Sequence, residues 1–115
     1  MDHKQIEEYI LSMPNAWLDY PFGEGVAVYK VGEKMFALIQ EGKEPVNLSL
    51  KCDPQLAKLL RERYETILEG YHLNKKHWNT IILTGQLPLD EVHDLIRHSY
   101  ILVNEGKDPS VPTGL

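Results

Sequence analysis

The run Val46–Lys51 constrains the fold of this chain more than any other stretch, because apolar and polar residues alternate there at every position. Successive side chains of a strand point to opposite faces of its sheet, so the three apolar residues are predicted to face a core. Asp53 and Pro54 follow almost at once and predict a helix, with aspartate as its N-cap and proline at its first position. The chain should therefore contain a sheet with one covered face and one partly open face. The polar side chains on the open face are then those of Asn47, Ser49 and Lys51.

The rest of the chain alternates between helical and extended patterns. Asp2 and Gln5 hold the capping-box positions before an apolar stripe with helical spacing, and Pro14 ends that helix. Two β-rich runs joined through Gly32 and Glu33 predict an antiparallel hairpin. The predicted elements are a helix at 3–13, a loop at 15–25, strands at 26–31, 34–40 and 46–51, a helix at 54–64, a strand at 78–83, and a helix between 88 and 106.

This order, α-β-β-β-α-β-α, predicts the α+β class: a single-domain α/β sandwich whose mainly antiparallel sheet carries the helices on one face. A chain of 115 residues has the length for one hydrophobic core. We expect one domain over residues 1–106. Residues 107–115 contain two prolines and a glycine without periodicity, so we expect a loosely ordered C-terminal tail.

The net charge of −5 argues against a protein that binds polyanions over its whole surface. Residues 51–77 are the exception, with six basic and four acidic side chains. The single cysteine, Cys52, excludes an internal disulfide and a cysteine-based zinc site. Because we find no signal-peptide pattern and no apolar run long enough to cross a bilayer, we expect a cytoplasmic protein with no membrane partner.

The stretch Gly70–Thr80 has the composition of a surface that meets a partner. It combines two aromatic residues, two histidines, two lysines and two asparagines. The lysines would contact phosphate or carboxylate, the amides and imidazoles would donate hydrogen bonds, and an aromatic ring would supply a stacking face. The polar face of strand 46–51 would extend this surface. The candidate binding residues are Asn47, Ser49, Lys51, His72, Asn74, Lys75, Lys76, His77, Trp78 and Asn79.

The segments Lys30–Ile39, Val46–Pro54 and Gly70–Thr80 resemble the MmcQ/YjbR family of small bacterial proteins. The match in order and spacing runs over essentially the whole chain apart from the tail. The resemblance implies a fold similar to the frataxin-like (CyaY-like) α/β sandwich. It also implies the DNA-binding function that is usually predicted for the family, through a double-wing arrangement. It implies no established activity.

Metal binding is weakly indicated. His72 and His77 are five positions apart, as are His93 and His98, so neither pair shares a strand face or a helix face. The frataxin-like fold suggests iron on an acidic first helix, but only three acidic residues precede Met13, and acids on an exposed helix are usually solvated. We therefore assign no metal and no cofactor.

Cys52 is the one candidate nucleophile. It follows Lys51 and precedes a predicted helix N-terminus, which could lower its pKa, but a small half-buried residue is the better interpretation. Ser49 has no base nearby in sequence. With no catalytic constellation recognised, we expect no enzymatic activity.

Two functions remain open for the Gly70–Thr80 stretch. One is DNA binding; the other is a non-catalytic adaptor that binds an anionic small molecule or a protein with the same surface. A purely structural role is the alternative, in which Tyr71 and Trp78 cap the core and Asn74 makes a turn. Alternation along the strand places Trp78 on the partly open face and Ile81 in the core.

Overall fold

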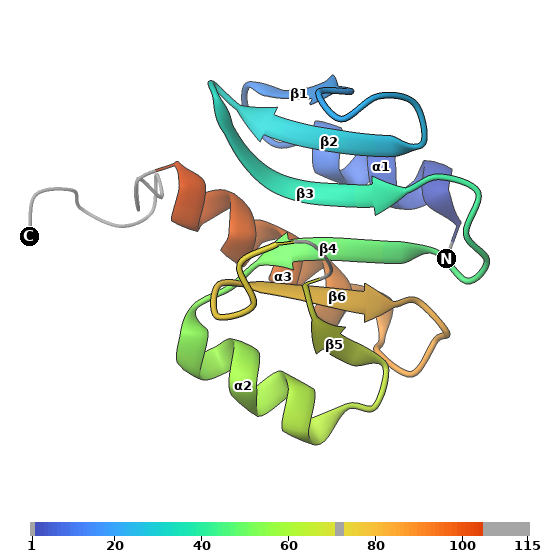
Figure 1. Cartoon of the computed structure of the whole chain (residues 1–115), viewed down its shortest axis with the longest axis vertical. Coiled ribbons are helices and arrows are strands. Elements are labelled where there is room, and N and C mark those ends of the chain that lie inside the picture. Colours follow the sequence, from blue (N-terminus) through green and yellow to red (C-terminus); the bar gives the residue numbers. More distant parts are fainter. Residues whose placement is uncertain (1, 71–72, 105–115) are drawn as a thin grey trace, which may run out of the picture.

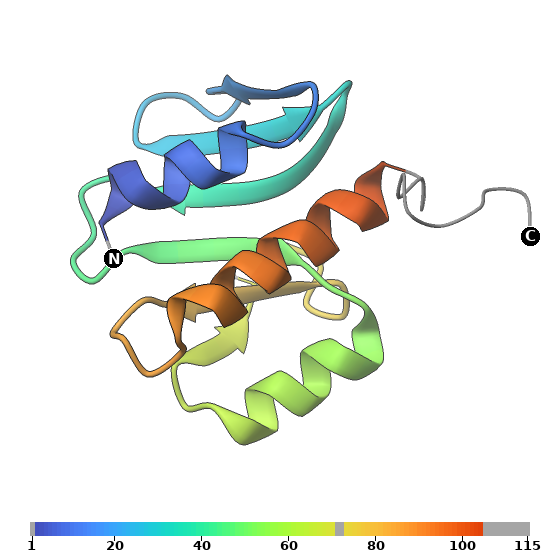
Figure 2. The same cartoon turned by 180° about the vertical axis from the view of Figure 1, so that it is seen from behind.

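Within the part of the chain that the structure describes, residues 2–70 and 73–104, a computed structural model shows one antiparallel sheet in the strand order β1-β2-β3-β4-β6-β5 (Figure 1). All three helices pack on the same face of this sheet, as the view from behind makes clear (Figure 2). The predicted α+β class is thereby confirmed. The strands are β1 (Ala16–Asp19), β2 (Val26–Val31), β3 (Lys34–Gln40), β4 (Asn47–Lys51), β5 (Ile67–Glu69) and β6 (Trp78–Ile82), and the helices are α1 (His3–Leu11), α2 (Pro54–Arg63) and α3 (Leu89–Val103).

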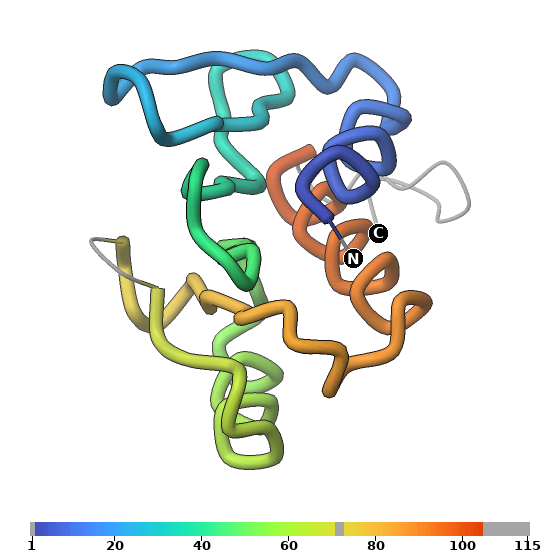
Figure 3. Tube along the Cα trace, turned by 90° about the vertical axis from the view of Figure 1, so that its right-hand side faces the viewer, coloured from blue at the N-terminus to red at the C-terminus, as the bar shows by residue number. Residues whose placement is uncertain are grey.

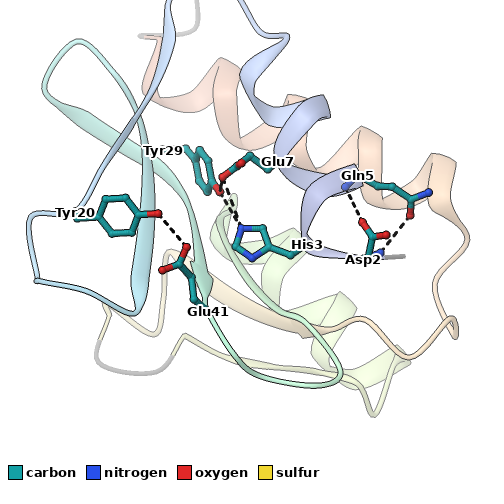
Figure 4. Close-up of polar contacts among 7 residues, drawn as sticks. All are labelled: Asp2, His3, Gln5, Glu7, Tyr20, Tyr29 and Glu41. Carbon is teal, nitrogen blue, oxygen red and sulfur yellow. Dashed lines mark hydrogen bonds and ion pairs between the residues drawn. The ribbon is translucent and has the colours of Figure 1, made fainter.

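Local signals in the sequence account for most of these boundaries. Asp2 and Gln5 form the predicted capping box, each side chain accepting a hydrogen bond from the other's backbone N–H (Figure 4). The Asp53 carboxylate accepts from two backbone N–H groups of the first turn of α2. Gly32 has a φ of +59° at the β2–β3 turn, a backbone conformation that residues other than glycine rarely adopt. The predicted hairpin and helix starts are confirmed.

Two short strands were not predicted. Residues 15–25 were expected to form a loop, but β1 pairs with β2, with Ala16 opposite Val31. The three residues of β5 pair with β6 at the other edge, with Ile67 opposite Ile81. The element order is therefore α-β-β-β-β-α-β-β-α. Both are edge strands too short to show a periodicity, and pairing with a longer neighbour stabilises them more than their own composition does. The predicted tail, 107–115, lies outside the described residues.

Helix α3 anchors the centre of the sheet by packing on β3 and β4. The ring of Tyr100 meets the ring of Phe36 edge-on, with centroids 5.5 Å apart. Ser99 is fully buried; its hydroxyl donates to the Phe36 carbonyl at 2.5 Å and accepts from the Lys51 N–H at 2.9 Å. Beyond the last β3–β4 pair the two strands diverge (Figure 1), so a serine side chain supplies the hydrogen bonds that the ladder no longer makes.

Helix α1 lies beside α3 on the same side of the strands, as the side view shows (Figure 3). Its contact with the sheet includes the buried Tyr29 of β2, whose hydroxyl donates to the Glu7 carboxylate at 2.5 Å and lies 3.5 Å from the His3 ring (Figure 4). Burial, and then the neighbouring Glu7 carboxylate, raise the pKa of Tyr29 far above its usual value, so the phenol stays a hydrogen-bond donor. The apolar core between sheet and helices thus contains a satisfied polar contact at each of α1 and α3.

Replacing Ser99 with alanine should destabilise the fold, because the Lys51 N–H and the Phe36 carbonyl would lose their hydrogen-bond partner beneath α3. We expect the free energy of unfolding to fall by about 2 kcal/mol, within the usual cost of leaving buried polar groups unpaired. Urea denaturation of Ser99→Ala measures this. Ser12→Ala is the matched control, because the Ser12 hydroxyl also bonds a backbone carbonyl but is exposed. Equal losses in the two variants would contradict the structural role of Ser99.

Candidate functional site

The face of the sheet away from the helices presents a row of side chains that crosses four strands. Leu38 of β3 lies opposite Ser49 of β4, and Ser49 lies opposite Thr80 of β6. Thr80 in turn lies opposite Leu68 of β5. Because paired residues of antiparallel strands point to the same side, these side chains are neighbours on the open face. The row is apolar at its ends and carries two hydroxyl groups in its centre.

The alternation predicted for β4 is confirmed. The apolar residues of this run are buried in the main core beneath α3, and the polar ones are partly exposed on the other side. The polar face of β4 was predicted as part of a binding surface, and the structure leaves it uncovered by any described helix. The three buried residues are Val46, Leu48 and Leu50, and the three partly exposed ones are Asn47, Ser49 and Lys51.

Two hydrogen-bonded pairs form a polar stripe on this face. Ser49 Oγ lies 2.7 Å from Thr80 Oγ1, and Asn47 Nδ2 donates to Gln40 Oε1 at 3.3 Å. Thr80 and Gln40 were not among the predicted site residues. Thr80 could have been found from the sequence, because it lies two positions after Trp78 and so points to the same face of the strand. Gln40 follows a run in β3 that is apolar on both faces, so no alternation of apolar and polar residues marks it.

The stripe lines a groove of about 650 Å³, a size typical of sites that hold small ligands. Most of the lining is apolar, and one lysine and one glutamate also contribute. Two predicted site residues, Asn47 and Ser49, line this groove, and so does Leu73, the neighbour of Asn74 in the chain. The lining residues are Phe22, Val26, Leu38, Gln40, Lys43, Asn47, Ser49, Leu68, Glu69, Leu73, Thr80 and Ile82.

Trp78 lies on the open face, as its register with Lys51 shows, but its side chain is only 6% exposed. It packs with Val28 and Leu38 in a second apolar cluster that also includes Leu73. The expectation that Trp78 offers a free stacking face is therefore wrong, because residues of β2 and β3 and Leu73 of the preceding connection pack in the same cluster. The cluster acts as a small core on the side of the sheet that lacks helices.

The β5–β6 connection is built by local hydrogen bonds. Asn74 Oδ1 accepts from the Lys76 N–H at 3.0 Å, and its carbonyl accepts from the His77 N–H at 3.1 Å. The His77 carbonyl accepts from Cys52. Lys75 and Lys76 are exposed, and Lys75 Nζ lies 3.9 Å from a Glu69 carboxylate oxygen. The predicted site residue His72, like Tyr71, lies outside the described residues.

Asn79 belongs to the helix face and not to the open face. It is 3% exposed, its Oδ1 accepts from Arg61 Nη1 at 2.7 Å, and its Nδ2 donates to the Ala57 carbonyl at 3.2 Å. These bonds fasten α2 to β6. Asn79 was predicted to donate to a partner, and the structure gives its amide a structural partner in α2 instead.

The basic excess of residues 51–77 is divided between two regions. Lys51 on β4 and the lysine pair of the β5–β6 connection lie at one end of the open face, since Lys51 is opposite Trp78, where that connection ends. The other three basic residues belong to α2 on the helix face, where Arg61 is engaged with Asn79. The sequence block is basic, but the fold does not gather it into one patch.

Cys52 is 4% exposed, and burial, followed by the Asp53 carboxylate, raises the pKa of its thiol to about 11. A thiolate nucleophile is therefore disfavoured at neutral pH. Next to it, the Asp53 N–H donates to His98 Nε2 at 3.1 Å, which requires a neutral imidazole. Burial lowers the pKa of His98, and the Asp53 carboxylate opposes this shift.

Metal ligands do not converge in the described residues, 2–70 and 73–104, where no group of three or more His, Cys, Asp or Glu side chains could hold an ion. Of the acids considered on the first helix, Glu7 accepts from Tyr29 and lies 3.6 Å from the His3 imidazole. In the same part of the chain, no helix has the length and apolar character needed to cross a bilayer.

Comparisons with known proteins agree on one family. A family model described as YjbR matches residues 11–102. The uncharacterized protein YbdF of Escherichia coli O157:H7 is 36% identical over 90% of this chain and 85% of its own length. The uncharacterized protein YjbR of Escherichia coli K12 is 32% identical over 87% of this chain and 85% of its own length. A crystal structure of Deinococcus radiodurans protein DR2400, which contains the family-model domain DUF419, superposes with a TM-score of 0.89 at 32% identity, covering 99% of this chain and 94% of that one.

Trp78→Ala should cost about 3–5 kcal/mol of unfolding free energy, as truncation of a large core aromatic does. The physical reason is the loss of the second apolar cluster and the cavity that the missing indole ring would leave beside Val28, Leu38 and Leu73. Chemical denaturation gives the value. Trp17→Ala is the matched control, because Trp17 is 41% exposed and its indole N–H donates to the Gly32 carbonyl. Similar losses at the two tryptophans would show that Trp78 is not a core residue.

Stability should fall in mildly acidic solution because of His98. Its pKa in the folded chain is lowered from the ordinary value of 6.5, so the unfolded state binds the proton more readily. The stability that neutral His98 contributes is complete above pH 6.5 and is lost as the pH falls through the pKa of His98 in the folded state. Melting temperatures of the wild type and His98→Gln, each measured at neutral and mildly acidic pH, should show the larger decrease in the wild type. The other histidines are present in both proteins, so equal decreases in melting temperature would show that His98 is not the cause.

Proposed function

This chain is a member of the YjbR family, and we propose that it is a non-enzymatic DNA-binding protein that contacts its partner through the open face of its sheet. The observation that carries the proposal is the polar stripe on that face, which lies between two lysine-bearing ends. Neutral amide and hydroxyl side chains beside lysines are the groups that proteins use to position a nucleic-acid strand.

The two lysine-bearing ends of the open face correspond to the two ends of β4. Lys43 precedes this strand and lines the groove, and Lys51 ends it. Lys75 and Lys76 lie near the Lys51 end, in the connection that leads to Trp78. Among the described residues, 2–70 and 73–104, the only ion pair of these four lysines is the exposed contact of Lys75 with Glu69. They are therefore available to phosphates as point charges.

The overall charge limits the strength of this binding. With a net charge of −5, the protein repels a polyanion except where the lysines lie. Contacts with three or four phosphates would give a logarithmic salt dependence with a slope of roughly −2 to −3 for single strands. The proposal is thus a local and salt-sensitive contact, not an extended basic surface.

A second candidate function is favoured by the groove itself. Its volume of about 650 Å³ and largely apolar lining also suit a non-catalytic adaptor that holds a small molecule or a segment of a protein. An uncharged ligand would bind without the salt dependence expected for DNA. Amide chemical-shift titrations with duplex DNA, single-stranded DNA and a nucleotide panel would distinguish the two functions and identify the face that responds.

Replacing Lys75 and Lys76 together with alanine should weaken DNA binding without unfolding the protein, because both are exposed. If each neutralises one phosphate, the slope of log K against log salt should become smaller in magnitude by about 1.4 for single strands. Fluorescence anisotropy across a salt series measures the slope, and thermal melts check the fold.

The double variant Lys58→Ala/Arg63→Ala is the matched control. It removes the same charge from exposed positions of α2, on the helix face of the sheet. A contact through the open face predicts a nearly unchanged salt slope for this variant. Equal effects of the two double variants would indicate a general charge effect and would move the binding site away from the β5–β6 connection.

A further inference from the structure

We propose that the open-face groove receives one unstacked nucleobase, so that the protein prefers single-stranded DNA, or a free nucleotide, to duplex DNA. This inference rests on the proposed function and adds which part of the nucleic acid enters the groove. Bases in a duplex are stacked and paired, which keeps their faces and pairing edges away from a recessed surface. A base of a single strand can turn out of the backbone and enter such a site.

The charges within the groove favour a neutral group inside it. The charged residues of the lining are Lys43 and Glu69, one of each sign. A phosphate in the groove would meet the Glu69 carboxylate, whereas a nucleobase carries no charge. The other lysines of the open face, Lys51, Lys75 and Lys76, do not line the groove. The charges inside the groove therefore balance, while lysines lie around it, and this arrangement matches a base flanked by phosphates.

The apolar lining suits the flat faces of a base. Phe22 and Leu68 both line the groove and remain 60% and 52% exposed, so the folded chain leaves two large apolar side chains in water there. A heteroaromatic ring placed against them would remove apolar surface from water and could stack on the Phe22 ring. Trp78 cannot take this role because it is buried. Phe22 thus supplies the aromatic contact that the sequence had suggested for Trp78.

The polar stripe suits the edge of a base. The bond from Asn47 to Gln40 uses one N–H and one oxygen lone pair, which leaves each carboxamide able both to donate and to accept further bonds. The Ser49 and Thr80 hydroxyls retain one donor and several lone pairs in the same way. Carboxamides pair with bases through adjacent donors and acceptors, as Asn and Gln do with adenine. The groove therefore offers stacking and edge recognition together.

The test uses the full chain and ligands that differ only in the accessibility of a base. A short mixed-sequence oligonucleotide is titrated as a single strand and as a duplex at the same salt concentration, and the four deoxynucleoside monophosphates are titrated beside deoxyribose 5-phosphate. We expect the single strand to bind roughly tenfold or more tightly than the duplex. The mononucleotides should compete with it and shift the amides of the groove, and deoxyribose 5-phosphate should not.

Variants assign the effect to the groove. Asn47→Ala and Phe22→Ala should each weaken single-strand binding by roughly tenfold, while duplex binding changes little. Phe22 is exposed, so its removal does not threaten the fold, and this variant keeps the test valid if Asn47→Ala is unstable. Gln55→Ala, an exposed amide on α2, is the control and should leave both affinities unchanged.

The outcomes separate the two proposals. Equal affinities for single strand and duplex, with no effect of Asn47→Ala or Phe22→Ala, would overturn the nucleobase site but leave DNA binding through the lysines standing. Mononucleotide binding in the groove without binding of either DNA would support the nucleobase site and refute the DNA function. Binding of a protein segment in the groove, with no response to any nucleotide, would overturn both.

Discussion

The packing of α3 against the two central strands is the interaction on which the rest of this structure depends. It buries the apolar side of β3 and β4 and places Ser99 where those strands diverge, so that a side chain completes the backbone hydrogen bonding that the sheet cannot. Because α1 and α2 pack on the same side, the main core forms on one face only. The other face must then be stabilised without a helix.

The open face meets this requirement with a small apolar cluster and leaves the remainder available. Trp78, Val28 and Leu38 pack together at one part of the face, and the groove with its polar stripe occupies the neighbouring part. Polar side chains that are shielded from water on such a face need hydrogen-bond partners, and here the paired hydroxyls and paired amides provide them. The same groups keep hydrogen-bonding capacity for a ligand.

Electrostatics is the further constraint on the partner that we propose for this face. The chain is acidic overall, and the fold separates its basic middle segment into an α2 group and an open-face group. What remains on the open face is a few lysines around a groove whose own charges balance. This arrangement agrees better with a short, partly neutral ligand or a flexible single strand than with the continuous phosphate ridge of a duplex.

The sequence by itself determined the elements that have strong local signals. The alternation of residues 46–51, the caps at Asp2 and Asp53 and the glycine of the hairpin turn each depend on neighbouring residues, and so does the open-face position of Asn47, Ser49 and Lys51. The family was also identifiable from three segments. The tertiary structure alone decided that β1 and β5 are strands, that Trp78 is covered, that Asn79 holds α2, and that Gln40, Lys43 and Phe22 join the groove. These features arise from contacts between residues far apart in sequence, and such contacts depend on the fold and not on the neighbouring residues within one segment.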